Sequence, residues 1–340
     1  MKKIIAYIFS GLILSFLSCK NEVINRETVE AVNNINIPEE QYTLTTNQTH
    51  NKFSSSIEPV LTVASGAIIE AYTKEASDGQ FNLNSTLEAL DSLDFEPIHP
   101  LTGPVYVKNA KPGDVLKVTL HKIELGDWGW NAILPGFGFL ANTINTKYLK
   151  LYELGKDRKS VTFKEGVELP LNPFPGVMGV APDTTALLST IPPRANGGNM
   201  DDPNMKEGTT LYFPVFVEGG LFSIGDGHAI QGLGEVCGTA IECSLRIVYE
   251  IELIKGKTIK EPQYETDEYY VTTGFAPTLD EAAKKAAFYM INYLKTEHNM
   301  TTDEAYALCS LAGDLQIAEV VDLPNMLVTM HISKSVLNIE

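Results

Sequence analysis

Residues 238–253 alternate between two sets of side chains along the run. A period of two places successive side chains on opposite faces of a β-strand, whereas a helix repeats about every 3.6 residues. The run therefore predicts one long strand with a core face and a face that is wet or functional. The core face consists of Ile241, Cys243, Leu245, Ile247, Tyr249, Ile251 and Leu253.

Shorter alternating runs, separated by Gly and Pro, continue over residues 42–260. In the run at 114–120, a turn precedes three apolar residues that share one face. The segment 128–193 is unusually rich in Gly and Pro. Such composition disfavours long regular elements, so we expect ordered loops there.

The pattern becomes helical near residue 278. Thr278 and Glu281 have the spacing of a capping box, and apolar residues then recur at helical intervals. Thr301 and Glu304 repeat the signal and open a shorter helix that ends near Gly313.

Strand-like runs at 269–273 and 326–332 surround these two predicted helices. The sequence thus predicts a mainly β catalytic region, sandwich-like or barrel-like, over residues 42–260. An α+β module is expected to follow over residues 261–340.

The N-terminus differs from the rest of the chain. Two lysines precede an apolar run over residues 4–17, and Cys19 follows a serine directly after it. The run is short for a membrane span and predicts a lipoprotein-type signal peptide over residues 1–18, with lipid on Cys19 and a polar linker over 19–41. An ordinary signal peptide and an uncleaved anchor are the alternatives. All three predict that the domain 42–340 is extracytoplasmic, in the periplasm or at the cell surface, with membrane contact only through the anchor.

Composition excludes several function classes. The formal charge is −17, and phosphates would be repelled, so we expect no nucleic-acid partner. Apart from Cys19, the three cysteines form no CxxC pair, which indicates neither a disulfide framework nor a thiolate zinc site. The chain also lacks a GxSxG elbow, a P-loop and a GxGxxG loop that opens a helix.

The densest group of polar side chains among glycines lies at residues 224–238. Glycine lets a backbone approach a ligand closely, and Asp226, His228 and Glu235 are residue types that bind divalent metals or move protons. Asp226 and His228 are two residues apart, so on an extended segment both point to the same side and can reach one ion. A structural turn is the alternative.

Further candidates lie outside this segment. Glu242 starts the polar face of the long strand, where a surface carboxylate is the alternative. Asn199 and Asp201 belong to a loop rich in Asn and Gly, which could equally be a solvent-exposed turn. His50 and His99 lie beside turn residues, where a lone histidine is more often structural.

Several blocks of the chain resemble, in the same order, the acetamidase/formamidase family, and the resemblance extends from about Tyr42 to the end. Residues 225–228 are similar to the family's Gly-Asp-x-His. Blocks in a shared order are more specific than any single motif. They comprise residues 59–63, 75–80, 99–107, 112–114, 175–182, 197–201 and 221–228.

This resemblance implies hydrolysis of formamide, acetamide or similar short amides by a mainly β catalytic domain with a C-terminal α+β part. It also implies a divalent metal, with zinc as the first choice and calcium or manganese as alternatives. A homo-oligomer such as a dimer is compatible with such an enzyme. Carried over by position, the metal ligands would be His50, Asp78, His99, Asp226 and His228. Glu235 or Glu242 would act as base and then as acid, and Asn199 and Asp201 would orient the amide.

One position departs from the family pattern. Many members read Gln-Gly-Asp-Gly-Glu, where this chain has Gln-Gly-Leu-Gly-Glu at residues 231–235. If that Asp orients a ligand, Leu233 alters substrate choice or activity. Two other functions therefore stay open: hydrolysis of a larger or cyclic amide on the same scaffold, and a non-catalytic, surface-anchored binding module.

Overall fold

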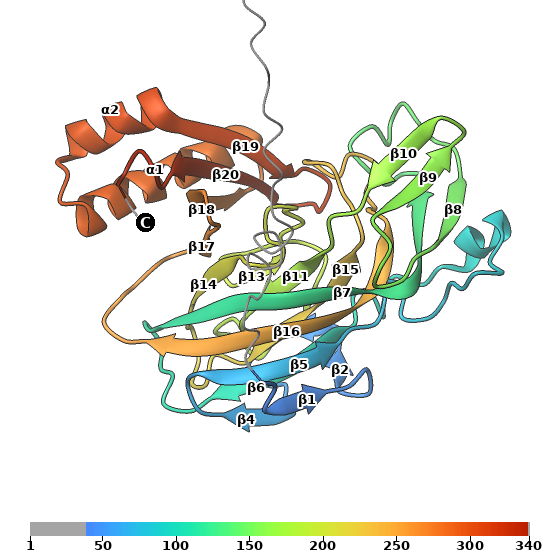
Figure 1. Ribbon diagram of the computed structural model, residues 1–340, viewed down its shortest axis with the longest axis horizontal. Helices are drawn as coiled ribbons and strands as arrows, with labels where there is room; N and C mark the ends of the chain where they lie inside the picture. Colours follow the sequence, from blue (N-terminus) through green and yellow to red (C-terminus); the bar gives the residue numbers. More distant parts are fainter. Residues whose placement is uncertain (1–38, 339–340) are drawn as a thin grey trace, which may run out of the picture. The chain divides into compact units, whose positions relative to one another are not determined.

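The computed structural model describes residues 39–338, and the signal peptide and most of the linker predicted from the sequence lie outside this range. The described part is mainly β, as predicted, with two α-helices near its end (Figure 1). Its strands are β1 (Tyr42–Leu44), β2 (Thr49–His50), β3 (Lys52–Phe53), β4 (Leu61–Val63), β5 (Ala67–Tyr72), β6 (Leu101–Val107), β7 (Val115–Ile133), β8 (Tyr148–Glu153), β9 (Ser160–Lys164), β10 (Val167–Pro170), β11 (Phe174–Gly179), β12 (Leu188–Ser189), β13 (Gly197–Asn199), β14 (Thr210–Pro214), β15 (Phe222–His228), β16 (Glu242–Ile254), β17 (Gln263–Glu265), β18 (Tyr269–Ala276), β19 (Gly313–Glu319) and β20 (Met326–Ser333). The helices are η3 (Leu87–Ser92, a 3₁₀ helix), α1 (Leu279–Glu297) and α2 (Thr302–Ala312).

Most of these strands belong to one large sheet, whose main path runs β13-β11-β15-β16-β7-β14-β17-β18-β20-β19. The two longest strands, β7 and β16, pair antiparallel along most of their length. β16 is the long strand predicted from the alternating pattern, and Cys243, Leu245 and Ile247 on its apolar side are buried. That prediction is confirmed, although the strand begins only at Glu242 because a turn precedes it.

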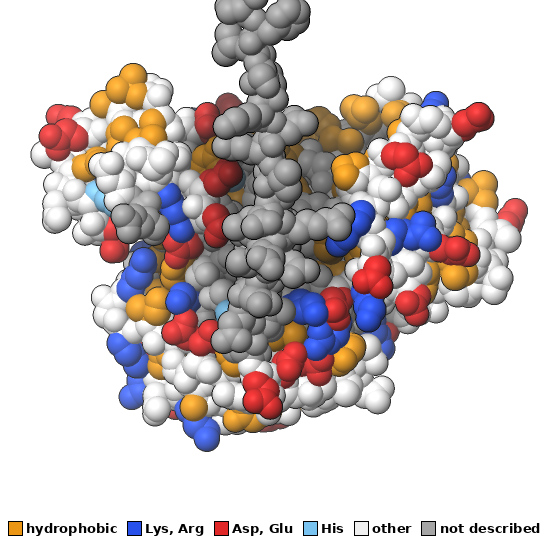
Figure 2. Space-filling view, viewed as in Figure 1, with side chains coloured by type: hydrophobic (Ala, Val, Ile, Leu, Met, Phe, Trp, Pro, Cys, Tyr) orange, Lys and Arg blue, Asp and Glu red, His pale blue; other side chains and the backbone are white. Residues whose placement is uncertain are grey.

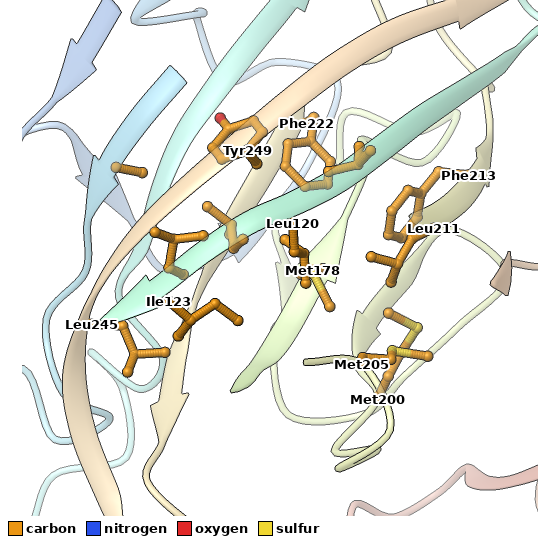
Figure 3. Packing of buried hydrophobic residues seen from close by; sticks show 14 of the residues in the cluster. Leu120, Ile123, Met178, Met200, Met205, Leu211, Phe213, Phe222, Leu245 and Tyr249 are labelled. Atoms are coloured by element: carbon orange, nitrogen blue, oxygen red, sulfur yellow. The ribbon is translucent and has the colours of Figure 1, made fainter. Parts of the chain in front are cut away.

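The main hydrophobic core lies between side chains of the long strands and side chains of β11, β14 and β15 (Figure 3). Leu120 and Tyr249 of the long strands point toward Met178, Phe213 and Phe222 of these other strands. All five side chains are fully buried. Burial of each such side chain contributes roughly 1.5–3 kcal/mol, so this packing fixes how the strands that carry the site lie relative to one another.

The prediction that residues 128–193 form loops is wrong. β7 extends to Ile133, and five further strands, β8 to β12, lie in this segment. Some of the glycines lie within these strands, at places where neighbouring atoms approach closely. A Cβ on Gly179, for example, would lie 2.8 Å from the backbone nitrogen of Gly198 in β13.

The C-terminal module was predicted more closely. Thr278 and Thr301 cap α1 and α2 by accepting hydrogen bonds from the backbone N–H groups of Glu281 and Glu304, as the capping-box spacing indicated. Both helices lie on one side of β18, β20 and β19 (Figure 1). Pairing of β17 with β14 makes these strands a continuation of the large sheet. Neither helix in the described range is long and apolar enough to cross a membrane.

The outer face of β5, β7 and β16 is covered by intermixed basic and acidic side chains (Figure 2). Arg246 of β16 is central there, because its guanidinium forms ion pairs with Glu70, Glu124 and Glu40. We call these four residues the Arg246 cluster. Arg246 lies only four residues along β16 from Glu242, which is buried.

Candidate active site

A glycine in β11 forms the floor of the site. β11 pairs with β15 so that Gly176 lies across from Asp226. A Cβ on Gly176 would lie 2.4 Å from Asp201 Oδ1, 2.7 Å from His228 Cε1 and 2.8 Å from Asp226 Oδ2. Atoms do not approach this closely, so only glycine leaves room for these three side chains to converge.

Three acidic residues of the site have a left-handed backbone. The φ angles are +43° at Asp201, +55° at Asp226 and +44° at Glu235. Residues other than glycine rarely adopt this backbone conformation, which costs of order 1 kcal/mol or more per residue. Strain of this kind at three residues of one cluster favours a functional reason for their placement.

His228 lies at the centre of the carboxylates. Its Nε2 is 3.1 Å from Glu242 Oε2 and 3.4 Å from Asp226 Oδ2, and its Nδ1 is 3.7 Å from Asp201 Oδ1. His99 approaches the same oxygen of Asp226, with Nε2 3.9 Å from Oδ2. One imidazole thus contacts carboxylates from three separate segments of the chain.

These carboxylates are buried, and several of their oxygens lack a hydrogen-bond partner in the described structure. Asp201, Asp226 and Glu242 are at most 3% exposed. Both carboxylate oxygens of Asp201, Oδ1 of Asp226, Oε2 of Glu242 and Nδ1 of His228 have no hydrogen-bond partner within the described structure. Because burial of an unpaired charge is strongly unfavourable, a bound cation would remove the imbalance.

Three overlapping groups of side chains could hold a metal ion. The first is Asp201, Asp226 and His228, in which one ligand atom from each lies within 4.8 Å of the others. The remaining two groups meet the same limit and consist of His228, Glu235 and Glu242, and of Asp201, Glu235 and Asp322.

Burial and mutual repulsion separate the pKa values of these acids. Burial raises the pKa of Glu242 to about 7, although His228 opposes the shift. Burial and the nearby Asp201 raise the pKa of Glu235 well above its usual range. Burial would also raise the pKa of Asp226, but His99 and His228 outweigh it and hold that pKa at about 2. Despite its own burial, His228 has a raised pKa because Glu242 and Asp226 stabilise its charged form.

The cluster forms one end of a cavity of about 40 Å³. This volume is large enough for water or a very small ligand. Asn199 also lines the cavity, and its Nδ2 donates to Asp322 Oδ2 at 2.7 Å. Its Oδ1 is buried and has no partner in the described structure. The opposite side of the cavity is apolar and includes Trp130 and Phe137.

Seven of the nine side chains selected from the sequence line this cavity. They come from five segments between residues 99 and 242, so the structure brings together what the sequence separates. The seven are His99, Asn199, Asp201, Asp226, His228, Glu235 and Glu242.

His50 and Asp78 do not line this cavity. His50 contacts the carbonyl oxygen of Lys52 through Nδ1 at 2.7 Å and Ser223 Oγ through Nε2 at 2.8 Å, so both ring nitrogens are engaged. Its burial lowers the pKa to about 4 and keeps the ring neutral. Asp78 is partly exposed and forms an ion pair with Lys74 at 2.6 Å.

Sequence reasoning did not select Asp322 or Gly176. Asp322 lies in the loop between β19 and β20 and reaches the cavity from the C-terminal module, with no local motif around it. Gly176 lies in one of the blocks that resemble the family, but its role depends on side chains from other segments. Leu233 is 45% exposed and does not line this cavity.

Comparison with known proteins points to one family. Residues 36–189 and 184–339 match the Acetamidase/Formamidase family. An acetamidase from Mycolicibacterium smegmatis is 29% identical over 269 residues, which cover 61% of this chain and 66% of that protein, just under two thirds of its length. The crystal structure of a predicted acetamidase/formamidase from the thermophile Thermoanaerobacter tengcongensis superposes with a TM-score of 0.82 at 36% identity, over 87% of this chain and 97% of that one. A gamma lactamase from Delftia acidovorans has a TM-score of 0.60 at 25% identity, over 86% of this chain and 93% of that one.

Proposed function

Since this chain belongs to the acetamidase/formamidase family, we propose that it hydrolyses short linear amides to a carboxylate and ammonia. The observation that carries the proposal is the group of buried, unpartnered carboxylates around His228 at the end of a small cavity. Amide hydrolysis requires an activated water, a stabilised oxyanion and a protonated leaving nitrogen. The residues of the cluster supply groups for each of these needs.

Asp201, Asp226 and His228 would hold a divalent metal ion. The residues present fit such an ion, because Asp201, Asp226 and His228 converge above Gly176, where a larger residue would fill the space, and each has a buried polar atom without a partner in the described structure. One imidazole with two carboxylates suits zinc, while a carboxylate-rich set also suits calcium or manganese. A bound ion would polarise the amide carbonyl and make water more acidic.

Glu242 and Glu235 are suited to move protons in opposite directions. Glu242, with a pKa of about 7, can accept a proton at Oε2 near neutral pH. Burial raises the pKa of Glu235 well above its usual range, which favours the protonated form, and that form can donate a proton to the leaving nitrogen. Two acids in one cavity with separated pKa values are the arrangement expected for a base and an acid.

Asn199 would orient the amide. Its Nδ2 donates to Asp322, which leaves Oδ1 buried without a partner at the edge of the cavity. A substrate NH₂ group can donate to this oxygen. Asp322 therefore acts as a positioning residue that the C-terminal module contributes to the site.

Ammonia release by the full-length protein tests this function. Formamide, acetamide and propionamide would be supplied before chelation, after chelation, and after addition of zinc, manganese or calcium. We expect activity that chelation abolishes and that one ion restores. Full activity in protein shown by elemental analysis to be metal-free would overturn the metal assignment, and no ammonia under any condition would overturn the amidase assignment.

Cyclic amides are the second candidate substrates, because the chain is also similar to a gamma lactamase. A γ-lactam contains the same amide group in a ring, so the polar residues would act in the same way on it. Parallel assays with acetamide and γ-butyrolactam separate the two substrate classes. A higher kcat/KM for the lactam would favour the cyclic substrate.

We also propose that the enzyme is exported and anchored through lipid on Cys19. This location rests on the sequence of residues 1–19. Labelled fatty acid should enter the wild-type protein but not the Cys19→Ser variant, which should leave the membrane fraction. A wild-type protein that takes up no label and fractionates with the cytoplasm would contradict the proposal.

A further inference from the structure

One buried carboxyl group near the site has no role in the proposed mechanism. Glu319 is the last residue of β19, lies three residues before Asp322, and is fully buried without lining the cavity. Its Oε2 has no hydrogen-bond partner within the described structure. Burial raises the pKa of Glu319 to about 8, with a smaller contribution from Asp201. Such a group is unfavourable for folding, so its placement favours a role other than stability.

Glu319 organises the turn that carries Asp322. Its Oε1 accepts hydrogen bonds from the backbone N–H groups of Val321 and Asp322, the second at 2.5 Å. The Leu323 N–H donates to the carbonyl oxygen of Val321 at 3.0 Å and closes the turn. One side-chain oxygen thus fixes two successive backbone groups, and the backbone in turn sets the direction of the Asp322 side chain.

Asp322 connects this turn to Asn199. Asn199 Nδ2 donates to Asp322 Oδ2 at 2.7 Å, and both side chains are buried and line the cavity. The loop between β19 and β20 contacts the same segment a second time, because Asn325 Nδ2 donates to the carbonyl oxygen of Pro193 at 2.8 Å. Since Asn199 Oδ1 has no partner in the described structure, the direction of this carboxamide depends on the bond that Nδ2 makes to Asp322.

The backbone of Glu319 is itself anchored to a second segment of the site. Gly234 and Glu319 form a parallel β-bridge, and the Gly234 N–H donates to the carbonyl oxygen of Ala318 at 2.7 Å. Glu235 follows directly and lines the cavity. The end of β19 is therefore held beside the loop that carries Glu235, which gives Glu319 a fixed backbone from which to hold Asp322.

From these contacts we propose that Glu319 is a positioning residue for amide hydrolysis, which acts through Asp322 to hold the Asn199 carboxamide toward the substrate NH₂ group. The requirement is for Oε1 as an acceptor of two backbone hydrogen bonds, not for a negative charge. This inference rests on the proposed function and goes further by assigning a residue outside the cavity to the reaction.

The test compares Glu319→Ala, Glu319→Gln and a control, Glu261→Ala, by kcat/KM for acetamide per folded protein. Glu261 is the matched control, because it is buried in the same C-terminal module, accepts the Phe275 N–H at 3.0 Å and does not line the cavity. Glu319→Ala should lower kcat/KM at least about tenfold. Glu319→Gln keeps an oxygen that can accept both bonds and should stay within about threefold of the wild type. Glu261→Ala should stay within about twofold, although it also lowers the free energy of unfolding.

A double-mutant cycle shows whether Glu319 acts through Asn199. Because the two residues belong to one series of contacts, Glu319→Ala combined with Asn199→Ala should lie within about twofold of Asn199→Ala alone. Losses that multiply in the double variant would overturn the proposal, since Glu319 would then act by another route. A fully active Glu319→Ala variant, or equal losses in Glu319→Gln and Glu319→Ala, would overturn it as well.

Hydrogen exchange separates this inference from the proposed function, because it requires no turnover. In Glu319→Ala, peptides that cover residues 319–325 and 196–201 should exchange at least about threefold faster than in the wild type, and in Glu261→Ala they should not. If no amide is hydrolysed but both segments exchange faster, the amidase assignment fails and the positioning of Asn199 stands. If ammonia is formed but residues 196–201 exchange as in the wild type and kcat/KM is unchanged, the positioning role fails and the amidase assignment stands.

Discussion

Two groups of charged side chains on the same strand, β16, are built in opposite ways. The Arg246 cluster is partly exposed, and its one guanidinium is paired with Glu70 at 2.6 Å and with Glu124 and Glu40 at 3.0 Å each. The cluster around His228 is buried, and several of its oxygens lack partners in the described structure.

The difference separates structural charges from functional ones. In an exposed ion pair each charge has a partner and contact with water, and the pair stabilises a fold only weakly. A buried group of like charges is unfavourable for folding, so its presence favours a role in binding or catalysis. Four residues along one strand are enough to change from one situation to the other, because the neighbouring strands differ. Glu242 lies beside β15, which carries Asp226 and His228, whereas Arg246 lies beside β5.

Asp226→Asn should produce the largest effect on activity. The amide would remove the negative charge that faces both His99 and His228, and kcat/KM should fall at least about 100-fold. Asp78→Asn is the matched control, since Asp78 was also selected from the sequence but does not line the cavity, and it should change kcat/KM less than about threefold. Comparable losses in the two variants would remove the distinction between the buried cluster and paired surface charges.

Gly176→Ala should weaken metal binding at the floor of the site without unfolding the protein. The added methyl group would meet Asp201, His228 and Asp226, so metal content and kcat/KM should each fall at least about tenfold. Gly232→Ala serves as the control, because a Cβ there meets nothing within 4 Å. Elemental analysis and ammonia release measure both effects. A fully active Gly176→Ala variant would contradict the placement of the cluster.

The two clusters should respond to pH in opposite directions. Glu242 binds its proton more tightly in the folded state, where its pKa is about 7, than in the unfolded state. The free energy of unfolding of metal-free protein should therefore fall as pH rises from about 4.5 to about 7, by on the order of 3 kcal/mol. A hydrogen bond from Arg246 lowers the pKa of Glu70 despite partial burial, so the Arg246 cluster loses its contribution only as pH falls below about 4.5.

Urea unfolding at pH 5 and pH 7 in the presence of a chelator measures this dependence. Glu242→Gln should reduce the slope in the metal-free protein, since the titrating carboxyl is gone. An unchanged slope in that variant would assign the dependence to another group.

Arg246→Ala should have the smallest effect. Loss of the exposed ion pairs should reduce the free energy of unfolding by about 1 kcal/mol, and less at high salt, because these charges are screened. Its kcat/KM should stay within about twofold of the wild type. A loss of activity comparable to that of Asp226→Asn would mean that the Arg246 cluster is coupled to the site.

Local patterns in the sequence predicted several elements closely. The alternation around Leu245 predicted β16, and the caps at Thr278 and Thr301 predicted α1 and α2, because these signals depend on residues near one another in the chain. β11 and β19 were missed. In β11, glycine and proline signal loops locally, while the tertiary need for close backbone approach requires the same residues in a strand.

The sequence by itself determined the periodicity of the main elements, the family resemblance and the pair Asp226 and His228, whose spacing of two residues places both on one side of a strand. Only the tertiary structure decided which other residues join that pair. Asp322 reaches the site through the C-terminal module, whereas His50 is engaged by Lys52 and Ser223 instead. The reason is physical: a strand fixes the direction of its own side chains, but the partners of a side chain come from segments that only folding brings within reach.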